Sequence, residues 1–302
     1  MEQSFYSNGK LLLTGEYAIL DGATGLAVPS QFGQSLHVKA TSSKILDWKS
    51  FDADNSVWFQ AQFSIQKLEA LSSSDANTSN TLKQILEVTL GMNRDFPLGN
   101  SGWQVESHLT FPRNWGLGTS STLINNIAQW AGIDPYGLLK NTFGGSGYDI
   151  ACAQNNKPLL YRLQDGGPQI EIVDFAPPFK DSLFFVYLNE KRNSREAIAK
   201  YRTLQFNGEA LLDGISSITE KVLVSSDLFE FEMLLNEHEQ LLSEVLRVPT
   251  VKSKLFPDYP GTIKSLGAWG GDFILATGKA EDMDYFNKKG YTVQVPFSKM
   301  VR

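Results

Sequence analysis

The amino-acid sequence predicts an α+β protein built from two domains. At 302 residues the chain exceeds the usual length of one domain. Its first third shows the alternation of apolar and polar residues that is typical of strands, whereas its second half has a strand followed by two long helical patterns. Hydrophobic residues make up 42% of the sequence, which is enough for a packed core in each domain. We expect a boundary near residue 165, with domains at 1–165 and 166–302.

Composition excludes several classes of function. A formal net charge of −6 argues against a large nucleic-acid interface, because such surfaces gather Lys and Arg. Cys152 is the single cysteine, so an intrachain disulfide and a cysteine-rich zinc site are both excluded, and we expect it to pack in the core. No apolar run approaches the ~18 residues of a membrane span, and the N-terminus lacks the pattern of a signal peptide. We therefore expect a cytoplasmic protein without a membrane partner.

The first third of the chain predicts a meander of strands. Residues 7–28 read as a strand, a glycine-containing turn and a second strand, with further strands at 34–40, 45–51 and 57–63. Lys10 and Glu16 lie six positions apart, so a continuous strand would place them on one face, unless Gly15 breaks the register. They could form a surface salt bridge, or Lys10 could be held ready for a phosphate.

Helical spacing of leucine and isoleucine predicts helices at 64–71 and 78–90, joined by the polar segment SSSDANTSN. Residues 103–110 alternate as a strand. A helix is expected from residue 119 to about 130, ending at Gly132, and a short one at 135–141.

The junction FPRNWGLGTSST, residues 111–122, links that strand to that helix. Gly116 and Gly118 allow a tight turn, and Thr119, Ser120 and Ser121 present three consecutive hydroxyls. Free N–H groups and the dipole at a helix start favour an anion, so the junction suits a phosphate. The same residues are also typical of a plain turn with a capped helix start.

A second glycine-rich turn, residues 143–153, contains Asp149 where the chain enters a helix. Asp149 could cap that helix or act in catalysis. Strands are expected at 157–163, 170–174 and 183–188, helices over most of 194–222 and over 228–246, and strands again at 273–277 and 291–297. A third glycine-rich turn, KSLGAWGGD, spans residues 264–272. The three histidines, at 37, 108 and 238, are scattered and are interpreted as ordinary strand or helix residues.

Together these segments resemble the sequence blocks of the GHMP kinases, the superfamily that includes galactokinase, homoserine kinase, mevalonate kinase and phosphomevalonate kinase. The matching strings are SNGKLLLTGEYAILDG, PRNWGLGTSS, GSGYDIA and KSLGAWGGD, in the family's order and spread over nearly the whole chain. The first and third strings look most like those of the mevalonate and phosphomevalonate branch. The string GYDIA resembles the hallmark of a bacterial branch that is named for it. The resemblance implies an N-terminal domain similar to ribosomal protein S5 domain 2 and a ferredoxin-like C-terminal domain, with ATP bound at their junction.

The resemblance also implies roles for single residues. Asp149 matches the general base, Lys10 the lysine that lowers the proton affinity of that base or stabilises the transferring phosphoryl group, and Glu16 the acidic neighbour of that lysine. Ser120 matches the hydroxyl that meets Mg²⁺. The matching phosphate loop is Gly116, Leu117, Gly118, Thr119, Ser120 and Ser121, and the third loop is Gly267, Gly270, Gly271 and Asp272.

Three departures from the family pattern bear on activity. Thr119 and Ser121 stand where relatives usually have serine and alanine. Relatives place a metal-binding glutamate on a helix between the phosphate loop and the catalytic aspartate, whereas here Asp134 is the sole acid between Ser120 and Asp149. Asp134 is interpreted as a turn or helix cap, so the Mg²⁺ site is either incomplete or completed by water and nucleotide oxygens. Trp269 replaces a common glycine and could narrow the acceptor pocket or pack between domains.

The sequence therefore supports three hypotheses. The first is an ATP-dependent, Mg²⁺-requiring kinase of a small alcohol or phosphoalcohol, with an acceptor similar to mevalonate or phosphomevalonate. The second is a degenerate relative that binds nucleotide or metabolite without efficient phosphotransfer. The third, an enzyme that phosphorylates and then decarboxylates as diphosphomevalonate decarboxylase does, fits the GYDIA and GGD strings less well.

Overall fold

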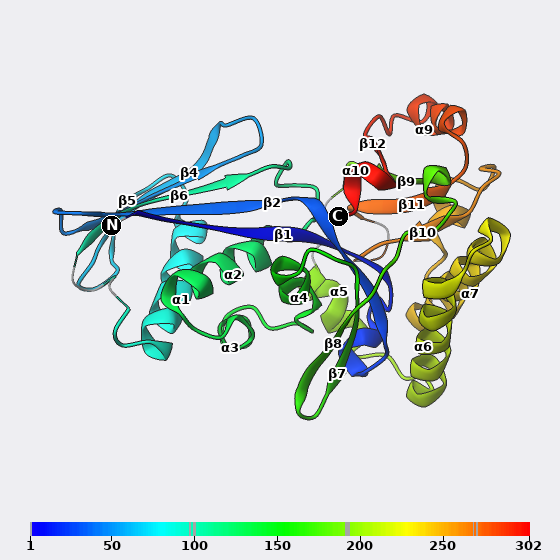
Figure 1. Cartoon of the computed structure of the whole chain (residues 1–302), viewed down its shortest axis with the longest axis horizontal. Helices are drawn as coiled ribbons and strands as arrows, with labels where there is room; N and C mark the ends of the chain where they lie inside the picture. The colour runs from blue at the N-terminus through cyan, green and yellow to red at the C-terminus, as the bar shows by residue number, and fades with distance from the viewer. Residues whose placement is uncertain (1, 97, 99–100, 191–193, 268, 270) are drawn as a thin grey trace. The chain divides into compact units, whose positions relative to one another are not determined.

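The computed structural model describes residues 2–96, 98, 101–190, 194–267, 269 and 271–302 (Figure 1). They form two compact units, each drawn from several segments of the chain. Unit 1 comprises Met1–Gly9, Phe32–Arg113 and Leu117–Gln154, and unit 2 comprises Lys10–Gln31, Asn114–Gly116 and Asn155–Arg302. The domain boundary near residue 165 stays a prediction.

Unit 1 contains a mixed sheet in which only β3, β4 and β5 form the predicted meander, because β6 lies between β2 and β3. The strands expected at the end of residues 7–28 and at 34–40 are one continuous strand, β2. Antiparallel pairs join β2 to β6, β3 to β4 and β4 to β5, while β3 runs parallel to β6. The first two strands are long and contribute to both units, because the unit boundary falls within each of them. The strand bounds are β1 Glu2–Thr14, β2 Gly25–Thr41, β3 Ile45–Phe51, β4 Val57–Ser64, β5 Ala70–Ser73 and β6 Gly102–Leu109.

The helix expected at residues 64–71 is wrong. The chain instead makes a tight turn between β4 and β5, in which Leu68 adopts a positive φ of 50° and its N–H donates to the carbonyl of Ser64. Ile65 and Leu68 are both buried in the core of unit 1. Their helix-like spacing therefore arises because two residues of one turn point into the same core.

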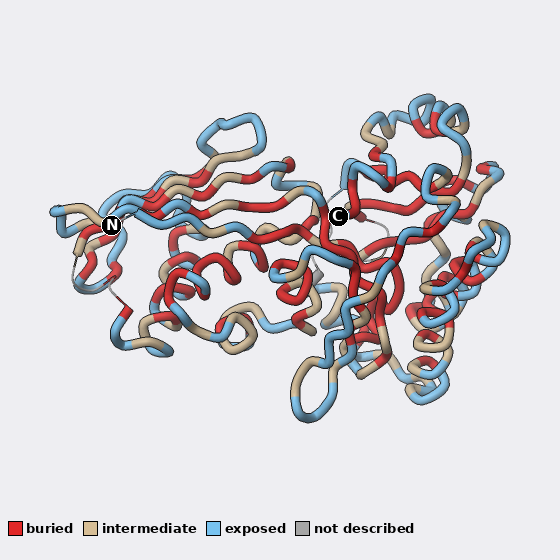
Figure 2. Tube along the Cα trace, in the orientation of Figure 1, coloured by how far each residue is buried: buried red, intermediate tan, exposed pale blue. Residues whose placement is uncertain are grey.

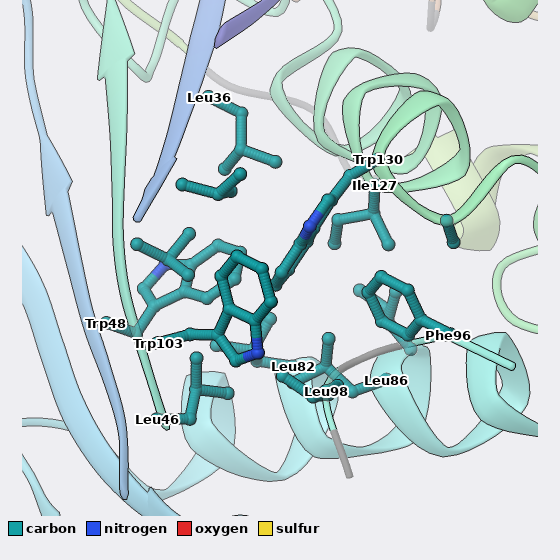
Figure 3. Packing of buried hydrophobic residues seen from close by; sticks show 14 of the residues in the cluster. Leu36, Leu46, Trp48, Leu82, Leu86, Phe96, Leu98, Trp103, Ile127 and Trp130 are labelled. Carbon is teal, nitrogen blue, oxygen red and sulfur yellow. The ribbon is translucent and has the colours of Figure 1, made fainter. Parts of the chain in front are cut away.

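Helices cover one face of the unit 1 sheet (Figure 1). Asp75 caps the first of them by accepting the N–H of Thr78. Between this helix, the next one and the sheet, Trp48, Trp103 and Trp130 pack with leucine and isoleucine side chains (Figure 3). Cys152 is also buried, as expected. The helix bounds are α1 Ala76–Met92, α2 Thr119–Ala131, α3 Pro135–Lys140 and α4 Tyr148–Gln154.

Unit 2 contains an antiparallel sheet of strand order β10-β11-β9-β12 and the hairpin of β7 and β8, whose strand β7 also pairs with the start of β2. Every residue of β9 and β11 is buried (Figure 2). The strand bounds are β7 Leu159–Gln164, β8 Gly167–Ile172, β9 Leu183–Tyr187, β10 Ile263–Ser265, β11 Phe273–Thr277 and β12 Gln294–Pro296.

Two antiparallel helices, α6 and α7, dominate the helical part of unit 2, and α7 has the bounds that its periodicity predicts. They bury an apolar cluster with the turn that follows β1, including Tyr17, Ala18, Leu211 and Leu242. None of the helices in the described ranges combines the length and apolar character needed to cross a bilayer. The helix bounds are α5 Ser194–Tyr201, α6 Gly208–Val224, α7 Leu228–Leu246, α8 Val251–Leu255, α9 Asp284–Lys288 and α10 Phe297–Met300.

Candidate active site

Helix α2 begins at Thr119, within the predicted phosphate loop. Gly118 is the N-cap and has a φ of 95°, a left-handed conformation that favours glycine. Ser121 is buried, and its hydroxyl donates to the Gly118 carbonyl at 2.9 Å. Ser120, by contrast, is exposed, and Thr119 is partly exposed. The loop therefore uses the Ser121 hydroxyl to hold its own shape and leaves the Ser120 hydroxyl accessible.

Helix α2 is fixed to the sheet of unit 1 by buried hydrogen bonds. The Thr122 hydroxyl donates to Oε1 of Gln34 at 2.6 Å, and the Asn126 amide donates to the Gln34 carbonyl at 2.9 Å. Ser7 on β1 donates to Oδ1 of Asn126 at 2.7 Å and accepts a bond from Asn125 at 2.8 Å. Hydrogen bonds among buried side chains restrict the motion of the elements that they join. The helix start that would face an anion is thus held by contacts from two strands.

Asp149 lies in the first turn of α4, a helix that packs against α2. The Asp149 side chain is half-buried, and its Oδ1 accepts the N–H of Ile150 at 3.1 Å. Burial, and then the negative charge of Asp149, raise the pKa of Tyr136. Asp149 is therefore partly accessible, with its carboxylate at the start of a helix.

In unit 2, Lys10 contacts the first residue of the predicted phosphate loop. Its Nζ donates to the Gly116 carbonyl at 3.0 Å, across 106 positions of sequence. Gly116 has a φ of 68°, and a Cβ built on it would lie 2.2 Å from the carboxylate of Asp272. Gly116 thus has an ammonium group on its carbonyl and a carboxylate beside its Cα, so no side chain fits there.

The third predicted loop supplies that carboxylate. Asp272 has a φ of 53°, a strained conformation for a residue with a side chain. Its backbone is held on both sides, because its N–H donates to the Glu190 carbonyl at 2.7 Å and its carbonyl accepts the Leu188 N–H at 2.8 Å. Gly267 has a φ of 70°, and Gly271 is buried. Gly270 lies outside the described residues.

Trp269, also in the third loop, packs within unit 2. Its ring lies against the apolar cluster that contains Tyr17 and Tyr201. The indole N–H donates to the Pro249 carbonyl at 3.1 Å, and the backbone N–H donates to the Tyr17 hydroxyl at 3.1 Å. These contacts explain why a bulky ring is accommodated at position 269: it packs against the apolar cluster and its N–H is hydrogen-bonded.

Glu16 belongs to a buried charged cluster that the sequence did not predict. Only 2% of Glu16 is exposed, so a surface salt bridge is wrong for this residue. Its Oε1 accepts a hydrogen bond from Lys264 Nζ at 2.6 Å, and Lys264 also lies 3.2 Å from Oε1 of Glu239. The neighbouring His238 accepts the Gly15 N–H at 2.9 Å through Nε2. A histidine on the apolar stripe of a predicted amphipathic helix is the signal that could have indicated this cluster.

Burial shifts the protonation of these groups. It raises the pKa of Glu16 to about 7, with Lys264 opposing the rise, and it also raises the pKa of Glu239. Burial, and then the charge of Lys264, hold the pKa of His238 well below its usual range. His238 is therefore neutral, which agrees with its acceptance of a backbone N–H at Nε2.

Asp134, the one acid between Ser120 and Asp149, caps helix α3. Its carboxylate accepts the N–H groups of Tyr136 and Gly137 at 3.2 and 2.8 Å. This confirms the interpretation of Asp134 as a cap. Within the part of the chain that the structure describes, no group of three or more His, Cys, Asp or Glu side chains forms a potential metal site.

The candidate residues thus gather in two sets, one in each unit. In unit 1 the candidate residues lie at the starts of α2 and α4, two helices that pack together. In unit 2 the Lys10 ammonium contacts the Gly116 carbonyl, and the Asp272 carboxylate lies beside the Gly116 Cα. The set in unit 1 is Leu117, Gly118, Thr119, Ser120, Ser121 and Asp149, and the set in unit 2 is Lys10, Glu16, Gly116, Gly267, Gly271 and Asp272.

The sequence and the structure were compared with those of known proteins. No protein-family model matches the sequence, and no curated protein matches it. Solved structures do match over nearly their full lengths. Streptococcus pneumoniae phosphomevalonate kinase in complex with phosphomevalonate and AMPPNP has a TM-score of 0.69 at 15% identity, with 97% of this chain and 99% of that chain covered.

Two further matches come from other branches of the same superfamily. L. major mevalonate kinase in complex with R-mevalonate has a TM-score of 0.68 at 14% identity, covering 97% of this chain and 95% of that one. Lactococcus lactis galactokinase complexed with galactose has a TM-score of 0.65 at 14% identity, covering 95% and 88%. The chain therefore has the two-domain α+β fold of the GHMP kinases, as its four sequence blocks imply.

Proposed function

We propose that this protein is an ATP-dependent kinase that transfers the γ-phosphoryl group to an alcohol or phosphate acceptor similar to mevalonate or phosphomevalonate. One observation carries the proposal: the ammonium group of Lys10 is held on the backbone of Gly116, the first residue of a glycine loop that leads into a helix start. Phosphoryl transfer needs mainly positioning and neutralisation of the charge on the phosphate oxygens. A lysine and free backbone N–H groups at a helix N-terminus supply both.

The residues at the start of α2 fit a nucleotide with Mg²⁺. Gly118 places no Cβ at the N-cap position, and the exposed Ser120 hydroxyl is available to the metal while the Ser121 hydroxyl is bonded to the Gly118 carbonyl. Mg²⁺ takes few protein ligands and keeps several waters, so the absence of the family's glutamate does not prevent binding. When bound, Mg²⁺ would neutralise charge on the phosphate oxygens of ATP.

Asp149 is proposed as the general base. A half-buried carboxylate at the start of α4 can accept the proton of an acceptor hydroxyl as the new bond to phosphorus forms. Lys10 is proposed to stabilise charge on the transferring group. The acceptor class rests on two matched structures, the complexes with R-mevalonate and with phosphomevalonate.

One observation favours a second function, nucleotide or metabolite binding without efficient transfer. The only acid between Ser120 and Asp149 is engaged as a helix cap, so no side chain in that segment replaces the family's metal-binding glutamate. Trp269 does not add to this alternative, because the contacts of its ring are explained by packing.

Acceptor-dependent release of ADP tests the proposal. The pure protein would be incubated with MgATP and a panel of mevalonate, phosphomevalonate, homoserine, galactose and other simple sugars, with an acceptor-free reaction as the control. We expect ADP release above the control with at least one mevalonate-type acceptor. Calorimetric binding of ATP without release of ADP for any acceptor would support the second function, and neither binding nor release would contradict both.

A further inference from the structure

Unit 2 contains a buried cluster of charged side chains, of which only Glu16 was singled out by the sequence. Glu16, His238, Glu239 and Lys264, which we call the lysine cluster, come from the turn after β1, from helix α7 and from strand β10. Lys264 is completely buried, and no more than 3% of any of the other three side chains is exposed. Removal of one partner from a buried ion pair leaves an uncompensated buried charge, so these four side chains depend on one another.

Two adjacent residues of α7 hold two different glycine turns. His238 accepts the N–H of Gly15, in the turn that follows the strand of Lys10. Glu239 accepts the hydroxyl of Ser265 at 2.8 Å, where the chain enters the third loop. Because both partners are side chains of one helix turn, α7 fixes the two turns relative to each other.

Lys264 joins the same two turns directly. Its Nζ donates to Oε1 of Glu16 at 2.6 Å and to the carbonyl of Ser265 at 2.5 Å. A third link lies further along, where the N–H of Trp269 donates to the Tyr17 hydroxyl. The two turns are therefore tied by a buried ion pair, by a hydrogen bond from a backbone N–H to a tyrosine hydroxyl, and through α7.

The turn after β1 has little freedom to adjust. Gly15 has a φ of 100°, and a Cβ on it would lie 2.7 Å from the Cα of Gly25. Tyr17, with a φ of 61°, is strained for a residue with a side chain. Helix α6 also holds this segment, because Thr219 donates to the Thr24 carbonyl at 3.0 Å. A strained turn persists only where its surroundings determine its conformation.

Both turns lead to Gly116. Lys10 lies six residues before Glu16, and its ammonium group is on the Gly116 carbonyl. Asp272 lies eight residues after Lys264, and its carboxylate is beside the Gly116 Cα. A shift of either turn would therefore change a contact with Gly116.

We propose that Lys264 is a positioning residue that, with Glu16, Glu239 and His238, sets Lys10 and Asp272 on Gly116 for phosphoryl transfer. The proposal rests on the proposed function, since it assigns Lys264 a part in that reaction. It differs from a plain stabilising role in one respect: loss of the cluster's charge balance should disturb the two turns and turnover while the rest of the fold persists.

The balance of charge in the lysine cluster can be altered with almost no change in side-chain size. The groups that face Lys264 are Glu16 from the turn and His238 and Glu239 from α7, so one cation faces two carboxyl groups and a neutral imidazole. Glu239→Gln keeps the size of the side chain and an oxygen for Ser265, but it removes one carboxylate. Glu232→Gln is the matched control, because Glu232 lies two turns earlier on α7 and bonds instead to Thr277 of β11.

The first experiment measures hydrogen exchange by mass spectrometry and steady-state turnover in the wild type and these two variants. For Glu239→Gln we expect exchange about tenfold faster in peptides from both turns, with unchanged exchange in α1 and α2. We expect kcat to fall about 10-fold to 100-fold while KM for MgATP changes little, since small displacements of catalytic groups act on the chemical step. The Glu232→Gln variant should show neither change.

A neutral triple variant, Glu16→Gln, Lys264→Met and Glu239→Gln, covers the case in which a single change prevents folding, because it leaves no unpaired buried charge. We expect it to fold with faster exchange in both turns and reduced kcat. Wild-type exchange in both turns, in either Glu239→Gln or the folded triple variant, would overturn the proposal. If the wild type releases no ADP with any acceptor, the proposed function fails, whereas the exchange data still decide whether the cluster holds the two turns.

Discussion

The ammonium group of Lys10 donates a hydrogen bond to the carbonyl oxygen of Gly116 at 3.0 Å, although 106 positions separate the two residues. The bond joins the first sequence block to the second and places a positive charge at the start of the glycine loop. A preorganised cation of this kind stabilises developing negative charge without reorganising during the reaction. This geometry supports the following predictions.

Lys10→Met should reduce turnover by about 10²-fold to 10³-fold, because the variant keeps the apolar stem but removes the charge at the loop. The melting temperature should stay close to that of the wild type. Lys157→Met is the matched control, since Lys157 is an exposed lysine of the same unit, paired with Asp174 at 2.9 Å. Equal turnover in the two variants would contradict the role of Lys10.

Gly116→Ala should destabilise the protein more than Gly132→Ala does. Both glycines have a positive φ, 68° and 63°, which costs an L-residue about 1–2 kcal/mol. A Cβ at Gly132 meets nothing within 4 Å, whereas one at Gly116 meets the Asp272 carboxylate. We expect a further loss of about 1–3 kcal/mol from this overlap, measured by urea unfolding.

Asp272→Gly provides the internal check on Gly116. Added to Gly116→Ala it removes the overlapping carboxylate, so a double-mutant cycle should show a coupling energy between the two positions of about 1 kcal/mol or more. Additive effects would mean that the overlap is relieved in another way.

Ser120→Ala and Ser121→Ala should separate binding from stability. The exposed Ser120 hydroxyl is assigned to Mg²⁺, so its loss should lower turnover at subsaturating Mg²⁺ and leave the unfolding free energy unchanged. The Ser121 hydroxyl is buried on the Gly118 carbonyl, so its loss should cost about 1 kcal/mol of stability. A Mg²⁺ titration of activity and urea unfolding of both variants distinguish the two roles. The reverse pattern would exchange the assignments.

Asp149→Asn should reduce turnover by at least about 10²-fold while ATP binding stays near normal, if Asp149 is the base. The substitution preserves an oxygen that can accept the Ile150 N–H, so helix α4 should keep its start. Calorimetric ATP binding and ADP release, measured on the same preparation, check both expectations. An unchanged rate would remove Asp149 from the role of base.

Stability should depend on pH through Glu16. Burial raises its pKa from 4.5 to about 7, so the folded protein binds the Glu16 proton more tightly than the unfolded chain does. The contribution of this group is therefore fully present below about pH 4.5 and is lost as the pH rises through 7. His238 acts in the opposite direction, because its lowered pKa makes the folded protein lose stability as the pH falls below 6.5.

Comparison with Glu16→Gln isolates the contribution of Glu16. The unfolding free energy of the wild type minus that of the variant should fall between pH 5 and pH 8, because the glutamine cannot lose a proton. Urea unfolding at four pH values in this range measures the difference. A difference that stays constant with pH would mean that Glu16 does not titrate there in the folded protein.

Local pattern was enough to predict most elements. The alternation in residues 103–110 and the apolar stripe of α7 predict a strand and a helix that the structure confirms, and Gly132 does end α2. The helix expected at 64–71 fails because spacing alone does not distinguish one helical turn from a tight connection whose Ile65 and Leu68 both enter the core.

The partners of individual side chains could not be predicted from local pattern. The sequence singled out Lys10, Glu16 and Asp149 from their blocks, but the only partner it offered for Glu16 was Lys10, and it treated His238 as an ordinary helix residue. Lys264 lies 248 positions from Glu16, and both become buried only when β10, α7 and the turn after β1 pack together. No local pattern encodes a contact of that separation.

The sequence by itself determined the fold, because its four blocks resemble those of the GHMP kinases and occur in the same order. It also indicated where the backbone turns at Gly116 and Gly118, because a positive φ is a local property that glycine permits. Only the tertiary structure decided what meets Gly116 and what pairs with Glu16. The physical reason is burial: a charge removed from water is costly unless it is paired, and only the folded chain brings the paired residues together.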